Sequence, residues 1–275
     1  MPHGFLQRQR HHAPKLVVPK TQMLLTRRHA AAAIFCALAQ HAWAEKSARQ
    51  PLIVLDPGHT PQQPGALSAR GIYEVDYNDR FVAELAPQLQ AAGWRVAITR
   101  LPPQSISLSE RANIANRLGA DLFLSIHHDS TRAQFMIPIE YKGRTAQMTA
   151  SHAPFHGYSV FISELNPQFG ASYAFAHFIA QRIRALGRTP ALYHADPRFG
   201  SARPLYDETL GIYRYDNLAV LRHTTVAAVL LEIGVLPNVK DEAWLSAPEN
   251  RRAMQQAIVG SVREYQKSRF YRATP

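Results

Sequence analysis

Four residues whose side chains can bind a metal or move a proton lie beside apolar runs of this chain. They are His59, Glu74, His127 and Glu232. Two imidazoles and a carboxylate suit one Zn²⁺, and a fourth residue can activate the water that such an ion carries. The residue types therefore predict a single catalytic zinc site.

The segments around these residues would bring them to one edge of a sheet. His59 follows the apolar run 52–55, and His127 follows the run 122–126. The carboxyl ends of parallel strands lie at the same edge, so two imidazoles distant in sequence can converge there. Glu74 opens the segment that leads into the first long helix, where the helix dipole favours a carboxylate. We expect all three side chains at this edge.

Glu232 directly follows the apolar run 229–231 and is the candidate general base. Burial of a carboxylate there raises its pKa toward the range that suits a base, whereas a nearby Zn²⁺ lowers it. The alternative is a salt bridge at the end of a strand, with Arg222 as the partner.

Apolar runs alternate with segments of helical period along the chain. The predicted strands are 52–55, 95–99, 122–126, 158–162 and 227–231. The predicted helices are 77–92, 109–118, 171–186 and 249–266. Near-continuous apolar runs are typical of strands that are covered on both faces. The alternation predicts an α/β fold with a mostly parallel, mixed central sheet and helices on both faces, of the phosphorylase/hydrolase-like kind.

Turn and cap residues mark the ends of these elements. Ser109 is the expected N-cap of its helix. Glycine follows three of the helices, at Gly93, Gly119 and Gly187, because the residue after a helix often adopts a left-handed conformation. The segments 131–157 and 188–217 are long and have no clear period, so they are expected to be surface loops inserted in the domain.

Residues 1–44 have the character of an export signal. They contain six Lys or Arg, no acidic residue and an apolar stretch at 30–39 that is too short to span a bilayer well. Ala42-Trp43-Ala44 provides the small residues that a signal peptidase requires, and Arg27-Arg28 suggests the twin-arginine route. Met23 is an alternative start. The predicted location is the periplasm or the cell envelope.

Composition limits what the exported chain can bind. The sole cysteine, Cys36, lies in the signal, so the core or a metal must stabilise the fold without disulfides. After the short linker 45–50, the rest of the chain has only a mild excess of positive charge, which is a part of the formal net charge of +11. This charge is spread along the sequence, which suits an anionic polymer such as a cell wall and predicts no nucleic-acid face. No membrane span is expected after the signal.

The four candidate residues lie in local motifs. These are Leu-Asp-Pro-Gly-His at 55–59, Glu74 after Gly71-Ile-Tyr, Ser-Ile-His at 125–127 and Leu-Glu-Ile-Gly-Val-Leu-Pro-Asn at 231–238. In these motifs, and from about Pro51 to Lys267, the chain resembles the zinc-dependent N-acetylmuramoyl-L-alanine amidases of the amidase 3 type. The resemblance implies a catalytic domain at 51–270 that cleaves the amide between N-acetylmuramic acid and L-alanine. It also implies a ligand set and a catalytic base, which are His59, Glu74 and His127 for Zn²⁺ and Glu232 for the base.

Three further residues have candidate roles, each with a structural alternative. Asp56 could accept a hydrogen bond from His59 and orient its ring, or it could form the turn before Pro57. His128 stands where the family has Ala, and the alternation of a strand would direct it to substrate or to the other side of the sheet. Arg222 matches a family position where a cation could bind a stem-peptide carboxylate, or it is an exposed charge.

Three residues outside the zinc motifs also have expected places. His194 and Arg203, in the second long loop, would line the substrate groove or be solvated. Asn238 matches the last Asn of the family motif and is expected to form a turn or a cap.

The resemblance also implies partners and leaves alternatives open. Peptidoglycan is the implied substrate. In many relatives a helix before the last strand blocks the zinc until a protein activator moves it, and Glu208 is the nearest candidate here for such a plug. A zinc exopeptidase of related fold and a catalytically inactive wall-binding protein are the alternative functions. A retained acid at position 232 favours an enzyme over a binding protein.

Overall fold

The computed structural model describes residues 49–273, and the predicted export signal at 1–44 lies outside them. The described residues form a mixed seven-stranded sheet with the strand order β2-β1-β3-β9-β6-β8-β7. The strands are β1 (Leu52–Pro57), β2 (Arg95–Ile98), β3 (Leu122–Asp129), β6 (Ser159–Ile162), β7 (Leu205–Asp207), β8 (Ile212–Arg214) and β9 (Ala227–Val235). The predicted α/β fold is thereby confirmed.

Strands β2, β1, β3 and β9 run parallel to one another in the half of the sheet that carries the candidate residues. Strand β6 is antiparallel to β9 and parallel to β8, and β7 is antiparallel to β8. The sheet is therefore mixed, as predicted. Because β1, β3 and β9 point the same way, their carboxyl ends meet at one edge.

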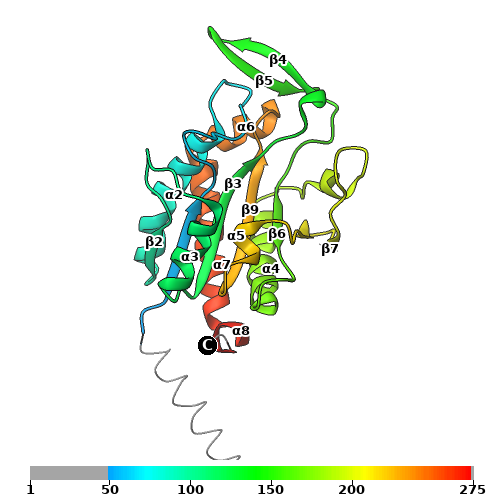
Figure 1. The fold of residues 1–275 in the computed structure, drawn as a ribbon. Coiled ribbons are helices and arrows are strands. Elements are labelled where there is room, and N and C mark those ends of the chain that lie inside the picture. Colours follow the sequence, from blue (N-terminus) through cyan, green and yellow to red (C-terminus); the bar gives the residue numbers. More distant parts are fainter. Residues whose placement is uncertain (1–48, 274–275) are drawn as a thin grey trace, which may run out of the picture. The chain divides into compact units, whose positions relative to one another are not determined.

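Helices cover both faces of this sheet (Figure 1). They are α2 (Glu74–Ala91), α3 (Leu108–Arg117), α4 (Phe169–Ala185), α5 (Ala219–Arg222), α6 (Val239–Ser246), α7 (Pro248–Lys267) and α8 (Arg269–Ala273). The larger core packs α2, α4 and α7 against one face, where Ile53, Leu124 and Val229 point. The smaller core packs α3 and α5 against the other face, where Val54 and Phe123 point. None of the described helices is long and apolar enough to cross a membrane.

Helix α3 begins earlier than predicted, and its cap is Ser107 rather than Ser109. The Ser107 Oγ accepts a hydrogen bond from the backbone N–H of Glu110 at 3.1 Å. Ser107 and Glu110 have the spacing of a capping box, in which a serine precedes an acid by three residues. The three glycines expected after α2, α3 and α4 all have positive φ, as predicted.

The two segments predicted to be loops contain strands. Within 131–157, a short 3-10 turn (Ala133–Phe135) precedes β4 (Met136–Tyr141) and β5 (Arg144–Thr149), which form an antiparallel ribbon (Figure 1). Pro138 in β4 hides the strand from sequence inspection, although a two-stranded ribbon tolerates proline at its edge. The segment 188–217 contains a 3-10 turn (Leu192–Ala195), the edge strand β7 and its neighbour β8.

Candidate metal centre

The loop after β1 brings His59 close to the end of β3. His59 adopts a left-handed conformation with φ of 65°. The preceding residue, Gly58, has to be glycine because a Cβ there would lie 2.3 Å from the His127 ring. The backbone of Gly58, in the motif 55–59, is thus packed against the side chain of His127, in the motif 125–127.

Two buried arginines hold this loop in place. Arg111 of α3 donates from Nη2 to the His59 carbonyl at 2.6 Å and from Nη1 to the Pro57 carbonyl at 2.7 Å. Arg100, which follows β2, donates from Nε to the His59 carbonyl at 2.8 Å and from Nη2 to the Gly58 carbonyl at 3.0 Å. Neither arginine was identified from the sequence. The available signal was the position of Arg100 just after a strand that ends at the same sheet edge.

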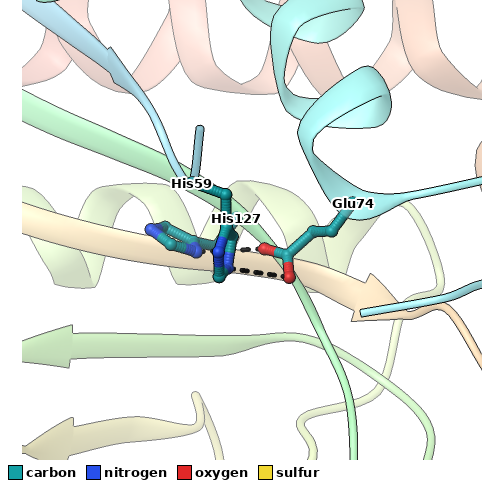
Figure 2. Close-up of side chains that lie close together, drawn as sticks. All are labelled: His59, Glu74 and His127. Atoms are coloured by element: carbon teal, nitrogen blue, oxygen red, sulfur yellow. Dashed lines mark hydrogen bonds and ion pairs between the residues drawn. The ribbon is translucent and has the colours of Figure 1, made fainter. Parts of the chain in front are cut away.

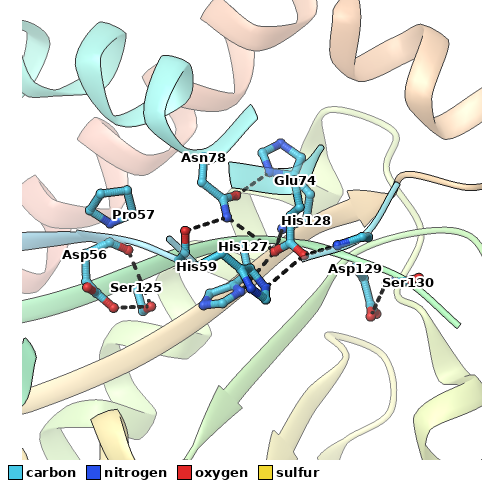
Figure 3. Close-up of polar contacts among 12 residues, drawn as sticks. Asp56, Pro57, His59, Glu74, Asn78, Ser125, His127, His128, Asp129 and Ser130 are labelled. Carbon is cyan, nitrogen blue, oxygen red and sulfur yellow. Dashed lines mark hydrogen bonds and ion pairs between the residues drawn. The ribbon is translucent and has the colours of Figure 1, made fainter. Parts of the chain in front are cut away.

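Asp56 anchors Arg111 and does not orient His59. Its Oδ1 accepts hydrogen bonds from Arg111 Nη1 at 2.7 Å and from Thr99 Oγ1 at 2.6 Å. Its Oδ2 accepts from Ser125 Oγ at 2.7 Å (Figure 3). The His59 Nδ1 instead lies 3.1 Å from the Gln63 carbonyl oxygen. Of the two alternatives for Asp56, a hydrogen bond to His59 is not formed, because the carboxylate binds Arg111, Thr99 and Ser125 instead.

His59, Glu74 and His127 converge, with one ligand atom of each within 4.8 Å of the others. Glu74 is the first residue of α2, and its Oε2 lies 2.9 Å from His59 Nε2. Its Oε1 lies 3.0 Å from His127 Nδ1, so the carboxylate faces both rings (Figure 2). Gly65, with φ of 76°, leaves room for this arrangement because a Cβ would lie 2.4 Å from Glu74 Oε2.

The charges of this cluster stabilise one another. Burial alone would raise the pKa of Glu74, but hydrogen bonds from His127 and His59 outweigh it and hold that pKa well below its usual value. Burial also disfavours protonation of His59, yet the hydrogen bond to Glu74 and its negative charge raise the pKa of His59 overall. Two imidazoles and a buried carboxylate that converge in this way have the donor set of a catalytic zinc site.

Glu232 lies beside this cluster on β9. Its Cα is paired with that of His127 on β3, so the two side chains leave the same face of the sheet. Both line a cavity of about 740 Å³, which also exposes His59 and which we call the metal cavity. Burial, followed by the negative charges of Asp129 and Glu74, raises the pKa of Glu232 well above its usual value. Its Oε2 is buried and has no hydrogen-bond partner among the described residues.

His128 points to the opposite face, as strand alternation requires. It is 2% exposed and packs against Tyr77 and Phe81 of α2. Its Nδ1 lies 2.7 Å from Asn78 Oδ1 (Figure 3). Burial lowers the pKa of His128 to about 3. Of the two predicted alternatives, the structure therefore places His128 in the core on the α2 side of the sheet.

Arg222 lies at the end of α5 and outside the metal cavity. Its Nε contacts His223 Nε2 at 3.0 Å, and it forms no ion pair with Glu232. The arginines in the cavity wall are Arg111 and Arg203, and His194 lies beside Arg203. Of the two alternatives for Arg222, its position outside the metal cavity favours a surface charge, whereas His194 and Arg203 line the cavity. His194 and Arg203 lie in the segment between α4 and β7, and local sequence could not reveal that this segment reaches the metal cavity.

Asn238 caps the helix that follows the last motif. Its side-chain Oδ1 accepts hydrogen bonds from the backbone N–H groups of Lys240 and Asp241, both at 3.0 Å. Its Nδ2 donates to the Phe155 carbonyl at 3.0 Å. The expected cap is confirmed, and it connects α6 to the segment before β6.

Comparison with known sequences gives a family assignment. The sequence model of the N-acetylmuramoyl-L-alanine amidase family matches residues 53–264. The chain is 28% identical over 231 residues to the N-acetylmuramoyl-L-alanine amidase AmiC of Neisseria meningitidis serogroup B, a match that covers 80% of this chain and 54% of AmiC. It is 28% identical over 215 residues to the probable cell wall amidase LytH of Staphylococcus epidermidis, covering 78% and 57%. The chain thus spans little more than half the length of these curated relatives.

Solved structures agree with the assignment. The catalytic domain of the amidase CwlV from Bacillus (Paenibacillus) polymyxa var. colistinus has a TM-score of 0.58 at 26% identity, covering 79% of this chain and 98% of that domain. The amidase Ami1 of Mycobacterium smegmatis shares the fold, with a TM-score of 0.61 at 23% identity and coverage of 80% and 98%. On the sequence match over 53–264 and this common fold, the chain belongs to the N-acetylmuramoyl-L-alanine amidase family.

Proposed function

We propose that this protein is a zinc-dependent hydrolase that cleaves the amide between N-acetylmuramic acid and L-alanine in peptidoglycan. The observation that carries the proposal is the convergence of His59, Glu74 and His127 beside Glu232 in a member of this family. Three protein ligands leave a coordination position for water, which is the arrangement of catalytic zinc.

His59, Glu74 and His127 would hold the ion. A bound Zn²⁺ supplies a Lewis acid that polarises a carbonyl and lowers the pKa of water. The hydrogen bond of His59 Nδ1 to the Gln63 carbonyl directs the other ring nitrogen toward Glu74 and fixes the orientation of the ring. Arg100 and Arg111 hold the backbone of the same residue, so the loop is preorganised before any ligand arrives.

Glu232 acts as the general base and then as the general acid. It takes a proton from the attacking water and delivers it to the amine of the leaving peptide. Its buried Oε2 and its raised pKa suit a carboxylate that must keep a proton between the two steps. A divalent cation held beside Glu232 would oppose this rise in pKa, because a positive charge favours the ionised carboxylate.

We further propose that the protein acts outside the cytoplasm, where its substrate lies. The relative LytH is named as a probable cell wall amidase, and residues 1–44 have the character of an export signal. The twin-arginine route, indicated by Arg27-Arg28, and a protein activator stay predictions. Glu208, the candidate plug, lies in the turn between β7 and β8 and does not line the metal cavity.

Digestion of purified peptidoglycan tests the proposal. The zinc-loaded protein is expected to release stem peptides with a free L-alanine amine, and a chelator is expected to stop the release. Glu232→Gln should bind zinc like the parent yet lose activity by about 100-fold or more, because it cannot accept a proton. Glu208→Gln, an exposed change of the same chemistry, is the matched control and should remain active. Undiminished cleavage by Glu232→Gln would remove the mechanism.

The same digestion separates the alternative functions. A zinc exopeptidase would release single amino acids and commonly uses two metal ions, whereas residues 49–273 contain one group of converging metal donors. An inactive wall-binding protein would retain peptidoglycan without releasing peptides, and it would not need a buried acid at position 232.

A further inference from the structure

A second cavity, of about 660 Å³, adjoins the metal cavity and carries three arginines in its wall. They are Arg132, Arg203 and Arg214. We call it the basic cavity. The two cavities share Asp129, His194, Arg203 and Tyr215 as lining residues, so a ligand that reaches Glu232 can extend into the basic cavity.

The three arginines differ in their charge balance. Arg214 is neutralised, because its Nη1 lies 2.7 Å from Glu164 Oε2 and its Nε lies 2.6 Å from Asp216 Oδ2. Arg132 and Arg203 form no ion pair with any carboxylate among residues 49–273. The basic cavity therefore has two arginines without a direct carboxylate partner, because its lining carboxylates, Asp129 and Asp216, are bound by other side chains.

Neighbouring side chains position the guanidinium of Arg203. Its Nη1 donates to His194 Nδ1 at 2.9 Å, and its Cζ lies 4.2 Å from the centre of the Tyr215 ring. Because arginine can only donate, the proton of neutral His194 must lie on Nε2, which donates to Asp129 Oδ2 at 2.6 Å. The hydrogen bonds therefore run from Arg203 to His194 and from His194 to Asp129, with His194 as the Nε2–H tautomer.

Arg203 still has an unused donor. Its Nε is buried and has no hydrogen-bond partner among the described residues. A buried N–H without a partner costs free energy until a ligand or water satisfies it. A guanidinium presents its donors in a planar fork that matches a carboxylate.

We propose that the basic cavity binds a carboxylate of the peptide leaving group, with Arg203 as the main donor and Arg132 as a second positive charge. The proposal rests on the proposed amidase function, because it assigns the peptide side of the substrate to this cavity. A peptide that carries carboxylates compensates the two arginines, whereas a neutral sugar ring does not. The cavity thereby selects substrates by the charge of the stem peptide.

Peptide binding by the zinc-loaded protein tests this assignment. One probe is a stem-type peptide that begins with L-alanine and has free carboxylates, and the other is the same peptide with every carboxylate amidated. Calorimetry should show that the parent binds the acidic peptide at least about tenfold more tightly, as expected for one charge-assisted contact. Arg203→Gln should abolish this preference, and Arg132→Gln should reduce it. Arg222→Gln, which changes an arginine outside both cavities, should keep it.

Equal binding of the two peptides by the parent, or binding of neither, overturns the proposal. An unchanged preference in Arg132→Gln also overturns it, and this variant decides the matter if Arg203→Gln does not fold, because Arg132 is exposed. Binding is measured without hydrolysis. If the protein shows the expected peptide preference but does not digest peptidoglycan, only the proposed amidase function is contradicted.

Discussion

Glu74 directs one carboxylate oxygen at each imidazole of the metal centre. Glu232 lies beside them, and its buried Oε2 has no hydrogen-bond partner among residues 49–273. At the scale of single residues, the chemistry of this site depends on which polar groups already have a hydrogen-bond or ion-pair partner. The two imidazoles and Glu74 contact one another, whereas Glu232 lines the metal cavity together with Arg203. The positive charge of Arg203 opposes the rise in the pKa of Glu232.

Gly58→Ala is expected to weaken zinc binding by about 10- to 100-fold, the loss typical of misplacing a residue that supports a metal ligand. The added Cβ would lie 2.3 Å from the His127 ring, so the imidazole has to move away from Glu74. Competition with a chromogenic chelator measures the affinity. Gly170→Ala, in α4, meets no atom closer than 3.9 Å and should bind zinc normally. Equal affinities for the two variants would contradict the close packing of Gly58 and His127.

His128 is expected to make the stability of the metal-free protein depend on pH. Its pKa is about 3 in the folded protein and 6.5 as the ordinary value, so the unfolded chain binds the proton more readily between these values. The stabilisation from neutral His128 is therefore complete above pH 6.5 and is lost as the pH falls toward 3. Urea unfolding in chelator at several pH values measures this dependence. His128→Ala should be less stable at neutral pH but should have a shallower slope between pH 6.5 and 3, and an unchanged slope would contradict the assignment.

At the scale of elements, helix α3 and the strand ends act together as a support for the first metal ligand. Arg111 extends from α3 into the sheet edge and connects Asp56 of β1 with the carbonyl of His59. The side chains of Arg111 and Asp56 are 3% and 0% exposed. An ion pair buried to this degree is costly to break from one side, because the remaining charge has no water around it.

Arg111→Gln is expected to reduce the free energy of unfolding by about 3–5 kcal/mol, as found when one partner of a buried pair is removed. It should also weaken zinc binding, because the backbone of His59 loses a donor. Arg117→Gln is a matched control on the same helix, since the side chains of Arg117 and Glu110 are 61% and 40% exposed. Urea unfolding of both metal-free variants should show a large loss for the first and little change for the second. Similar stabilities would contradict the supporting role of Arg111.

At the scale of the whole molecule, a single sheet edge collects residues from distant parts of the chain. Residues 59, 74, 127 and 232 come from the loop after β1, from β3 and β9, and from the start of α2. No described residue is a cysteine, so disulfides cannot stabilise this part of the chain. A bound ion that connects a strand end, a helix start and a loop is then expected to stabilise the whole domain.

Zinc at about one hundred times its dissociation constant is expected to add about 2.7 kcal/mol to the free energy of unfolding, because it binds only the folded protein. For a domain of this size the melting temperature should rise by roughly 5–10 °C. Calorimetric melting with zinc, with chelator and with magnesium measures the effect. Magnesium prefers oxygen ligands and should not replace zinc. A melting temperature that is insensitive to zinc and chelator would contradict a metal site at this edge.

Much of the fold was predictable because its signals are local. The strands at 52–55, 122–126 and 227–231 are continuous apolar runs, and the structure confirms and extends each of them. Errors arose where a local signal competed with tertiary context. Ser109 appeared to be a cap, but the capping box of Ser107 begins the helix earlier. The ribbon β4–β5 was not predicted because Pro138 lies in β4. Each strand of this ribbon has a partner on one side, and proline is tolerated on the unpaired side.

The sequence by itself determined the strands, the family motifs and the residue types that can bind zinc and move a proton, because each is written in a few neighbouring residues. Only the tertiary structure decided which side chains meet. Asp56 pairs with Arg111 rather than His59, and Arg203 rather than Arg222 enters the metal cavity. These contacts join residues that are far apart along the chain, and burial and packing set them in ways that no local pattern encodes.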